Sequence, residues 1–178
     1  TPRPGYLNTP TDIDMGAGND LVHIYSPSGM TTALGGTGDD SFIVDRIPPL
    51  TTDILGVRDT VNLDGGEGTD SYVVNLTPGG SDYIVNVHDS GTVAGELDLL
   101  TINGTDDADS LLLRQNFVAK LNGAVVERVN YDATINGGLV INAGLGDDAF
   151  YVDDNDAITT LNGDAGSDCF HIGQLFGS

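Results

Sequence analysis

The residues of this chain whose type and spacing could do chemistry are aspartates that follow glycine-rich turns. Six of them take the same place after such a turn: Asp20, Asp40, Asp70, Asp109, Asp148 and Asp168. Calcium takes six to eight oxygen ligands from carboxylates and backbone carbonyls, at about 2.3–2.6 Å. Glycine tolerates positive φ and close backbone approach, so a Gly-rich turn can aim several carbonyls at one point. The pattern therefore predicts calcium sites in these turns.

The turns belong to a repeat of the form G-G-x-G-x-D-x-apolar-x. Its copies are GAGNDLVHI from Gly16, GGTGDDSFI from Gly35, GGEGTDSYV from Gly65, GTDDADSLL from Gly104, AGLGDDAFY from Ala143 and GDAGSDCFH from Gly163. The turn backbone adds candidate ligands at Gly16, Gly18, Gly36, Gly38, Gly66, Gly68, Gly144, Gly146 and Gly166. Asp39 and Asp147 place a second acid in their turns, where each can add a carbonyl or raise the local negative field.

The spacing of the six aspartates predicts the size of a structural unit. Successive steps are 20, 30, 39, 39 and 20 residues. We interpret 20 as the basic period, 30 as one unit with an insertion, and each 39 as two units of which one has lost its motif. The best candidates for shared ions are therefore the pairs one period apart, Asp20 with Asp40 and Asp148 with Asp168.

Short alternating segments flank each turn and must position it. Examples are TTAL at 31–34 and GLVIN at 138–142 before a turn, and DSFIV at 40–44 and DAFYV at 148–152 after one. A period of two is that of a half-buried strand. A strand–turn–strand unit of about 20 residues cannot bury its apolar face alone, so units must stack. We predict an all-β, right-handed parallel β-solenoid (a β-helix or β-roll), one domain over residues 1–178, with a single inward stack of Val22, Phe42, Tyr72, Leu111, Phe150 and Phe170.

The nonapeptides resemble the haemolysin-type, or repeats-in-toxin, calcium-binding repeats. The resemblance implies that the sixth-position Asp and the turn carbonyls of one unit share an ion with the next unit. Two copies depart from the family pattern, with Thr105 and Asp107, or Asp164, in place of glycine. The family's β-roll carries a motif every nine residues on both edges, whereas here the motif recurs about every 20. We therefore expect the calcium-binding turns along one edge only.

The charge balance limits the partners. Asp and Glu number 27 against 6 Lys and Arg, a formal net charge of −21, and Glu supplies only 3 of the acids. Such a chain repels itself unless cations neutralise it, and it lacks the basic groove that nucleic acid requires. Its apolar runs are too short for a membrane span, and the single Cys169 excludes an internal disulfide.

Two alternatives compete with calcium binding. A Gly-x-Asp segment can be a plain Asx turn without metal, although six copies at a solenoid spacing favour calcium. Parallel β-helix enzymes cleave polysaccharides with carboxylate clusters, which Asp153, Asp154 and Asp156 could imitate. The chain has no Trp and only one Lys with which to hold a sugar chain, so we expect no enzyme.

The function we expect is a calcium-stiffened structural or adhesive module of a secreted or cell-surface bacterial protein, such as an adhesin, sheath or fibre. Motifs close to both ends indicate a segment of a longer array, or a subunit that stacks on its own copies, with surface or matrix glycans as further partners. Two alternatives stay open: a calcium-dependent folding and secretion module of a type I secreted toxin or enzyme, and a carbohydrate-active β-helix enzyme.

Overall fold

The computed structural model describes residues 10–27, 29–47, 60–81, 83–123 and 125–173. This part of the chain is all-β, and it contains no helix that could cross a membrane. A nine-stranded sheet has the order β1 (Thr11–Asp14), β3 (Thr31–Thr37), β5 (Thr60–Glu67), β7 (Ile84–His88), β11 (Glu127–Asn130), β10 (Phe117–Lys120), β9 (Ser110–Arg114), β13 (Ala149–Val152), β15 (Cys169–Ile172). A six-stranded sheet has the order β14 (Thr159–Asn162), β12 (Gly138–Gly144), β8 (Leu99–Thr105), β6 (Ser71–Asn75), β4 (Ser41–Val44), β2 (Leu21–Ile24).

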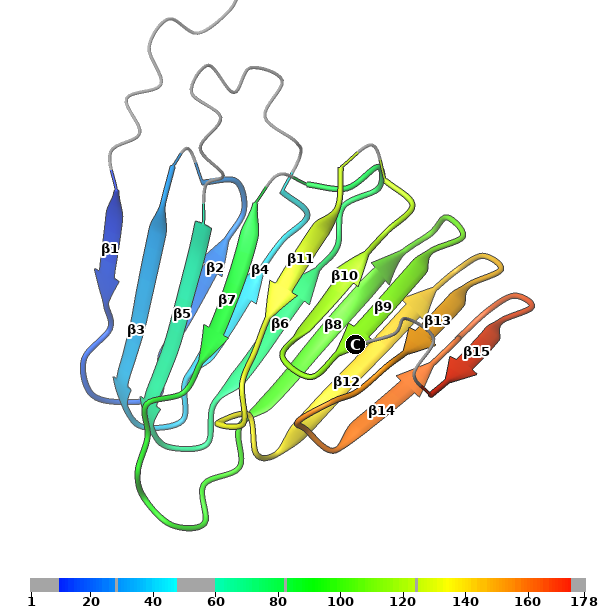
Figure 1. Cartoon of the computed structure of the whole chain (residues 1–178). Coiled ribbons are helices and arrows are strands. Elements are labelled where there is room, and N and C mark those ends of the chain that lie inside the picture. The colour runs from blue at the N-terminus through cyan, green and yellow to red at the C-terminus, as the bar shows by residue number, and fades with distance from the viewer. Residues whose placement is uncertain (1–9, 28, 48–59, 82, 124, 174–178) are drawn as a thin grey trace, which may run out of the picture.

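The chain passes back and forth between the two sheets (Figure 1). Neighbouring strands are parallel, except that β10 runs antiparallel to β9 and β11. All connections from the nine-stranded to the six-stranded sheet therefore lie at one edge, which we call the first edge. It lies at the lower ends of β1, β3, β5 and β7 in Figure 1. The described return connections, such as that from β8 to β9, lie at the opposite, second edge.

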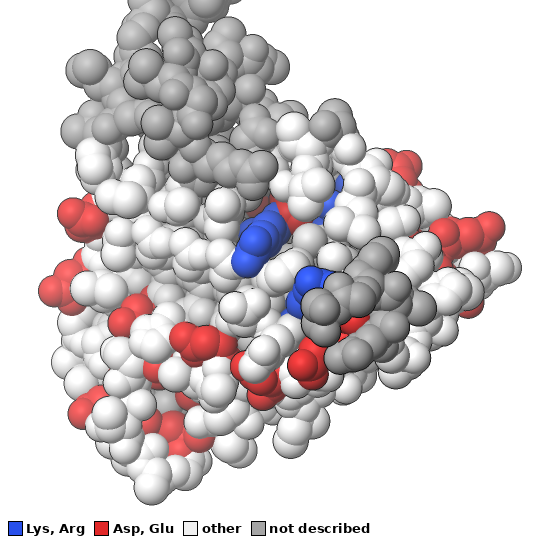
Figure 2. All heavy atoms as spheres, viewed as in Figure 1, with Lys and Arg blue, Asp and Glu red and all other residues white. Residues whose placement is uncertain are grey.

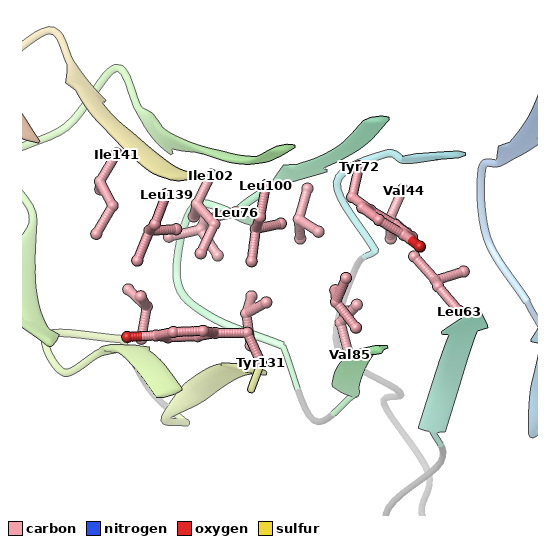
Figure 3. Packing of buried hydrophobic residues seen from close by; sticks show 14 of the residues in the cluster. Val44, Leu63, Tyr72, Leu76, Val85, Leu100, Ile102, Tyr131, Leu139 and Ile141 are labelled. Carbon is pink, nitrogen blue, oxygen red and sulfur yellow. The ribbon is translucent and has the colours of Figure 1, made fainter. Parts of the chain in front are cut away.

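The core lies between the two sheets. In the inner strands alternate side chains are buried, as in the intermediate–buried pattern of β4 and β6, whereas β1, β14 and β15 bury none. Figure 3 shows Leu100, Ile102 and Leu139 of the six-stranded sheet facing Val85 and Tyr131. The alternating segments of the sequence thus formed strands because period-two patterning gives each strand one apolar face.

The predicted single aromatic stack is wrong and is replaced by two. In the six-stranded sheet Val22 pairs with Phe42 and Phe42 with Tyr72, whose rings lie 5.0 Å apart. In the nine-stranded sheet, Leu111 pairs with Phe150 and Phe150 with Phe170, whose rings lie 4.7 Å apart. The physical reason is that the first three motifs precede strands of one sheet and the last three precede strands of the other.

The interpretation of the 39-residue steps as two units with a lost motif is also wrong. Between Asp70 and Asp109 the chain runs through β6, β7 and β8, which is one and a half circuits of the two sheets. Between Asp109 and Asp148 it makes a single circuit, lengthened by the added β9–β10–β11 meander. The 30-residue step is one circuit with an insertion, as predicted, since β4 and β6 are neighbours.

Ladders of asparagine amides tie the circuits together. In the six-stranded sheet the side-chain amide of Asn103 donates to Asn75 (2.9 Å), that of Asn142 to Asn103 (2.9 Å) and that of Asn162 to Asn142 (2.7 Å). A second ladder joins Asn62, Asn86 and Asn130 in the nine-stranded sheet. Each amide can donate to one neighbour and accept from the other only if successive strands are in register.

Candidate metal centre

The sixth-position aspartates form two ladders, one at each edge of the sheets. At the first edge the backbone N–H of Asp20 donates to Asp40 Oδ1 (2.8 Å), that of Asp40 to Asp70 Oδ1 (2.6 Å) and that of Asp70 to Asp98 Oδ1 (2.9 Å). At the second edge the N–H of Asp109 donates to Asp148 Oδ1 (2.6 Å) and that of Asp148 to Asp168 Oδ1 (3.0 Å). Both pairs expected to be neighbours, Asp20 with Asp40 and Asp148 with Asp168, are neighbours.

The expectation that all six turns share one edge is wrong. The turns of Asp20, Asp40 and Asp70 lead from the nine-stranded to the six-stranded sheet, whereas those of Asp109, Asp148 and Asp168 lead back. The switch follows from the half-integral number of circuits between Asp70 and Asp109. The turns that carry the motif therefore lie on both edges of the sheets.

The predicted turn glycines have the backbone that the motif requires. All nine candidates, from Gly16 (φ 92°) to Gly166 (φ 141°), have positive φ. The turns of successive circuits also touch, because a Cβ on Gly66 would lie 2.3 Å from the carbonyl oxygen of Gly36. Asp164, at the second position of its copy, is the sole non-glycine residue of the described ranges with positive φ (60°). Asp tolerates this conformation better than most residues.

The acids at the fifth position hold the turns together at their exposed side. Asp39 Oδ1 accepts the backbone N–H of Thr69 (3.0 Å), and Asp147 Oδ1 accepts that of Ser167 (2.9 Å). Asn19 accepts the N–H of Asp39 in the same way (3.1 Å). These side chains therefore bond to the backbone of the next circuit.

The second carboxylate oxygen of the ladder residues points into the turn. Oδ2 of Asp20, Asp40, Asp70 and Asp148 is buried and has no hydrogen-bond partner among the described residues. A Cβ on the first glycine of the motif would lie 2.3 Å from Asp40 Oδ2 at Gly35, and 2.2 Å from Asp70 Oδ2 at Gly65. The first glycine thus leaves room for that oxygen. Burial raises the pKa of Asp40 and of Asp148, because a carboxylate without a partner loses its hydration.

Three buried aspartates converge at the first edge. Asp70, Asp89 and Asp98 each bring an oxygen to within 4.8 Å of the others. They come from the β5–β6 turn, from the residue after β7 and from the residue before β8. Asp89 lies opposite the Tyr72 hydroxyl, which donates to its Oδ2 (2.9 Å) and accepts from the N–H of Gly65 (2.7 Å).

The electrostatics of this three-aspartate cluster favour a cation. Burial, and next the charge of Asp89, raise the pKa of Asp70 to about 7. Burial, with the charges of Asp89 and Glu96, raises the pKa of Asp98. Asp70 Oδ2 and the Tyr72 hydroxyl both approach Gly65. A Cβ on Gly65 would lie 2.2 Å from the first atom and 2.4 Å from the second. The donors are hard oxygens of high negative charge, which is the donor set of a divalent cation such as Ca²⁺.

Asp89 and Asp98 were not foreseen from the sequence. Asp98 does begin a segment, DLLTI, with the same Asp-then-alternating pattern as the motif copies. It lacks a preceding Gly-rich turn, and so a search for the turn misses it. For Asp89 the sequence gives no local signal, because its place in the cluster depends on the path of the loop between β7 and β8.

Asp109 is arranged differently from the other ladder residues. Its Oδ2 accepts the backbone N–H of Thr105 (2.7 Å) and its Oδ1 accepts the Thr105 hydroxyl (3.1 Å). The ammonium Nζ of Lys120 lies 3.5 Å from Oδ1. Here the chain itself supplies the positive charge, in the copy in which Thr105 replaces the second glycine.

On the face shown in Figure 2, acidic side chains are spread from end to end, while basic side chains appear at a few points near the middle.

Comparisons of the chain with models of known protein families, with curated proteins and with solved structures find no match.

Proposed function

We propose that this chain is a calcium-stabilised structural or adhesive module that works outside the cell, a right-handed parallel β-solenoid similar to the repeats-in-toxin proteins. The observation that carries the proposal is the three-aspartate cluster at the first edge. Asp70, 1% exposed, has an Oδ2 without a hydrogen-bond partner among the described residues, and one of its carboxylate oxygens lies within 4.8 Å of oxygens of Asp89 and Asp98. Three adjacent buried carboxylates are costly without a cation, because their mutual repulsion adds to the loss of hydration.

Calcium fits this cluster better than magnesium does. Ca²⁺ accepts six to eight oxygens in irregular geometry, whereas Mg²⁺ demands near-octahedral ligands and holds its waters. The cluster offers carboxylates from three separate segments of the chain. The carbonyl oxygen of Gly66, which lies beside Gly91, is a further oxygen near this cluster. Asp40 and Asp148, each with a buried Oδ2 that lacks a partner in the described ranges, are candidates for further ions.

Coupling between calcium and folding suits an exported protein. A ligand that binds the folded chain stabilises it in proportion to the logarithm of the ligand concentration. Where calcium is scarce, as in the cytosol, a chain of net charge −21 is destabilised by self-repulsion; in millimolar calcium outside the cell it folds. Stacking on further copies is part of the proposal, since parallel sheets extend by adding a strand to an outer strand such as β1 or β15.

Thermal unfolding with and without calcium tests this function. Chelator-treated protein is followed by far-UV circular dichroism as Ca²⁺ is added, with Mg²⁺ as the matched control. We expect the melting temperature to rise with Ca²⁺ to a plateau and to rise far less with Mg²⁺. A melting temperature that does not change with Ca²⁺, together with no heat of binding in titration calorimetry, would refute the proposal.

A further inference from the structure

A second cluster of charged groups is buried at the second edge, and it contains the one lysine of the chain. The side chain of Lys120 is 3% exposed and that of Asp109 is fully buried. Nζ of Lys120 lies 3.5 Å from Asp109 Oδ1 and donates to the carbonyl of Thr77 (3.2 Å). Glu127 Oε2 accepts the N–H of the same Thr77 (2.8 Å). An amine and two carboxyl groups are therefore buried in one cluster, in which Lys120 contacts Asp109 and both Lys120 and Glu127 bond to Thr77.

The β9–β10–β11 meander is what brings these three residues together. Asp109 immediately precedes β9, Lys120 ends β10 and Glu127 begins β11. In the antiparallel register Lys120 lies directly opposite Glu127 on one side and Leu111 on the other. All three groups thus lie at the same end of adjacent strands.

Two hydrogen-bond donors polarise the carboxyl group of Asp109, which makes its carbon more electrophilic. Thr105 donates its backbone N–H to Oδ2 (2.7 Å) and its hydroxyl to Oδ1 (3.1 Å). Donors placed in this way stabilise the negative charge that develops on a carboxyl oxygen when a nucleophile adds to the carbon. Thr105 occupies the second-glycine position of the motif, so this copy has exchanged a calcium-type turn for hydrogen-bond donors.

We propose that Lys120 and Asp109 condense to form an intramolecular isopeptide bond. Nζ adds to Cγ of Asp109, the bond from Cγ to one carboxyl oxygen breaks, and that oxygen leaves as water. Ammonium and carboxylate together give one amide and one water, so atoms and charge balance without an oxidant or a co-reactant. Glu127 accepts a proton from the nitrogen and delivers it to the departing oxygen.

Two features of the cluster support this reaction over a permanent ion pair. The 3.5 Å between Lys120 Nζ and Asp109 Oδ1 keeps the amine against the carboxyl group, and fixed placement of this kind replaces a bimolecular encounter. Burial raises the pKa of Glu127 to about 7, partly offset by its bond to Thr77 and by Lys120, and a proton carrier is most effective when its pKa lies near the working pH. A buried ion pair by itself adds little stability, whereas an amide removes both charges.

The intact mass of the folded full-length chain tests the proposal. We expect a mass lower than that of the sequence by one water, and after proteolysis a branched peptide that joins the segments of Asp109 and Lys120. The branched peptide separates the cross-link from dehydration of an aspartate elsewhere. Protein unfolded in denaturant before the reaction should have the full mass and lose water only after refolding.

Three variants sharpen the experiment. Lys120→Arg retains a positive charge that cannot form the amide, and it should keep the full mass. Glu127→Gln retains the shape of the side chain and should slow the mass loss at least tenfold. Asp109→Asn should reach the same final mass as the cross-linked wild type, since it loses ammonia in place of water. A folded wild-type chain with the full sequence mass after days at neutral pH, and with no branched peptide, would overturn the proposal and leave a buried ion pair only.

Discussion

Replacement of Asp70 by Asn should stabilise the metal-free protein and weaken its response to calcium. Asn is nearly isosteric with Asp, and its Oδ1 can still accept the N–H of Asp40. Its amide nitrogen would take the place of the unpartnered Oδ2 and could donate to Asp89. The substitution thus removes one charge from the three-aspartate cluster and supplies a donor where the cluster has too few.

The size of the expected stabilisation of the metal-free protein follows from the pKa of Asp70. At about 1.4 kcal/mol per pH unit, a pKa of about 7 in place of 3.8 makes the ionised form costlier by roughly 4 kcal/mol. Because part of this cost is shared with Asp89 and relieved by relaxation, we expect about 2 kcal/mol in favour of the variant above pH 7. For a chain of this size that is a rise of roughly 5 °C in the metal-free melting temperature.

Calcium should reverse the order of the two proteins. A site filled at a hundredfold excess over Kd contributes about 2.7 kcal/mol to the folded wild type, and Asp70→Asn forfeits most of this. The assay is urea unfolding at pH 7.5 in chelator and in Ca²⁺, with Asp12→Asn as control, because Asp12 is exposed and gives the same change in charge. A variant less stable than wild type in chelator would contradict the account of the cluster.

The metal-free protein should also be more stable near pH 5 than at pH 7.5. The raised pKa of Asp70 means that the folded state holds more protons between pH 3.8 and about 7, so stability falls as pH rises through that window; a melting temperature that falls on acidification from pH 7.5 to 5 would count against this. Gly36→Ala should destabilise the fold by roughly 2 kcal/mol more than Gly16→Ala, because both have positive φ but only a Cβ at Gly36 would lie 2.0 Å from a carbonyl oxygen; equal urea midpoints would show that the turns do not pack. Asn103→Ala should cost about 2 kcal/mol and Asn162→Ala about 1 kcal/mol, since Asn103 has two ladder bonds and Asn162 one, again measured by urea unfolding.

Local pattern was sufficient to predict the strands that flank the motif turns. The segments 31–34, 138–142 and 148–152 were expected to be strands from their alternation, and they lie in β3, β12 and β13. Buried side chains alternate with more exposed ones in β3 and β12, as a half-buried strand requires. The turn glycines were equally predictable, because all nine have positive φ, and at Gly36 and Gly66 a Cβ would also meet a carbonyl oxygen of the neighbouring turn.

The assignment of each turn to an edge was not predictable from spacing alone. A 39-residue step can hold two circuits, one and a half circuits, or one circuit with a hairpin, and the chain uses the last two. The strands that decide between these, β7 and β10, carry no motif, so only their pairing partners reveal which sheet they join. The three-aspartate cluster was partly hidden for the same reason, because Asp98 continues the first-edge ladder from a loop that lacks the Gly-rich motif.

The copies of the motif handle the same electrostatic difficulty in different ways. Asp40, Asp70 and Asp148 each accept a backbone N–H through Oδ1, so the second oxygen determines what else each of these turns can bind. At Asp40, Asp70 and Asp148 that oxygen is buried and unpartnered among the described residues, and the turn is glycine-rich. At Asp109 the same oxygen receives the Thr105 N–H, and Lys120 brings the charge. In this copy, where Thr105 replaces the second glycine, the chain supplies its own positive charge, and we expect this turn to fold without calcium.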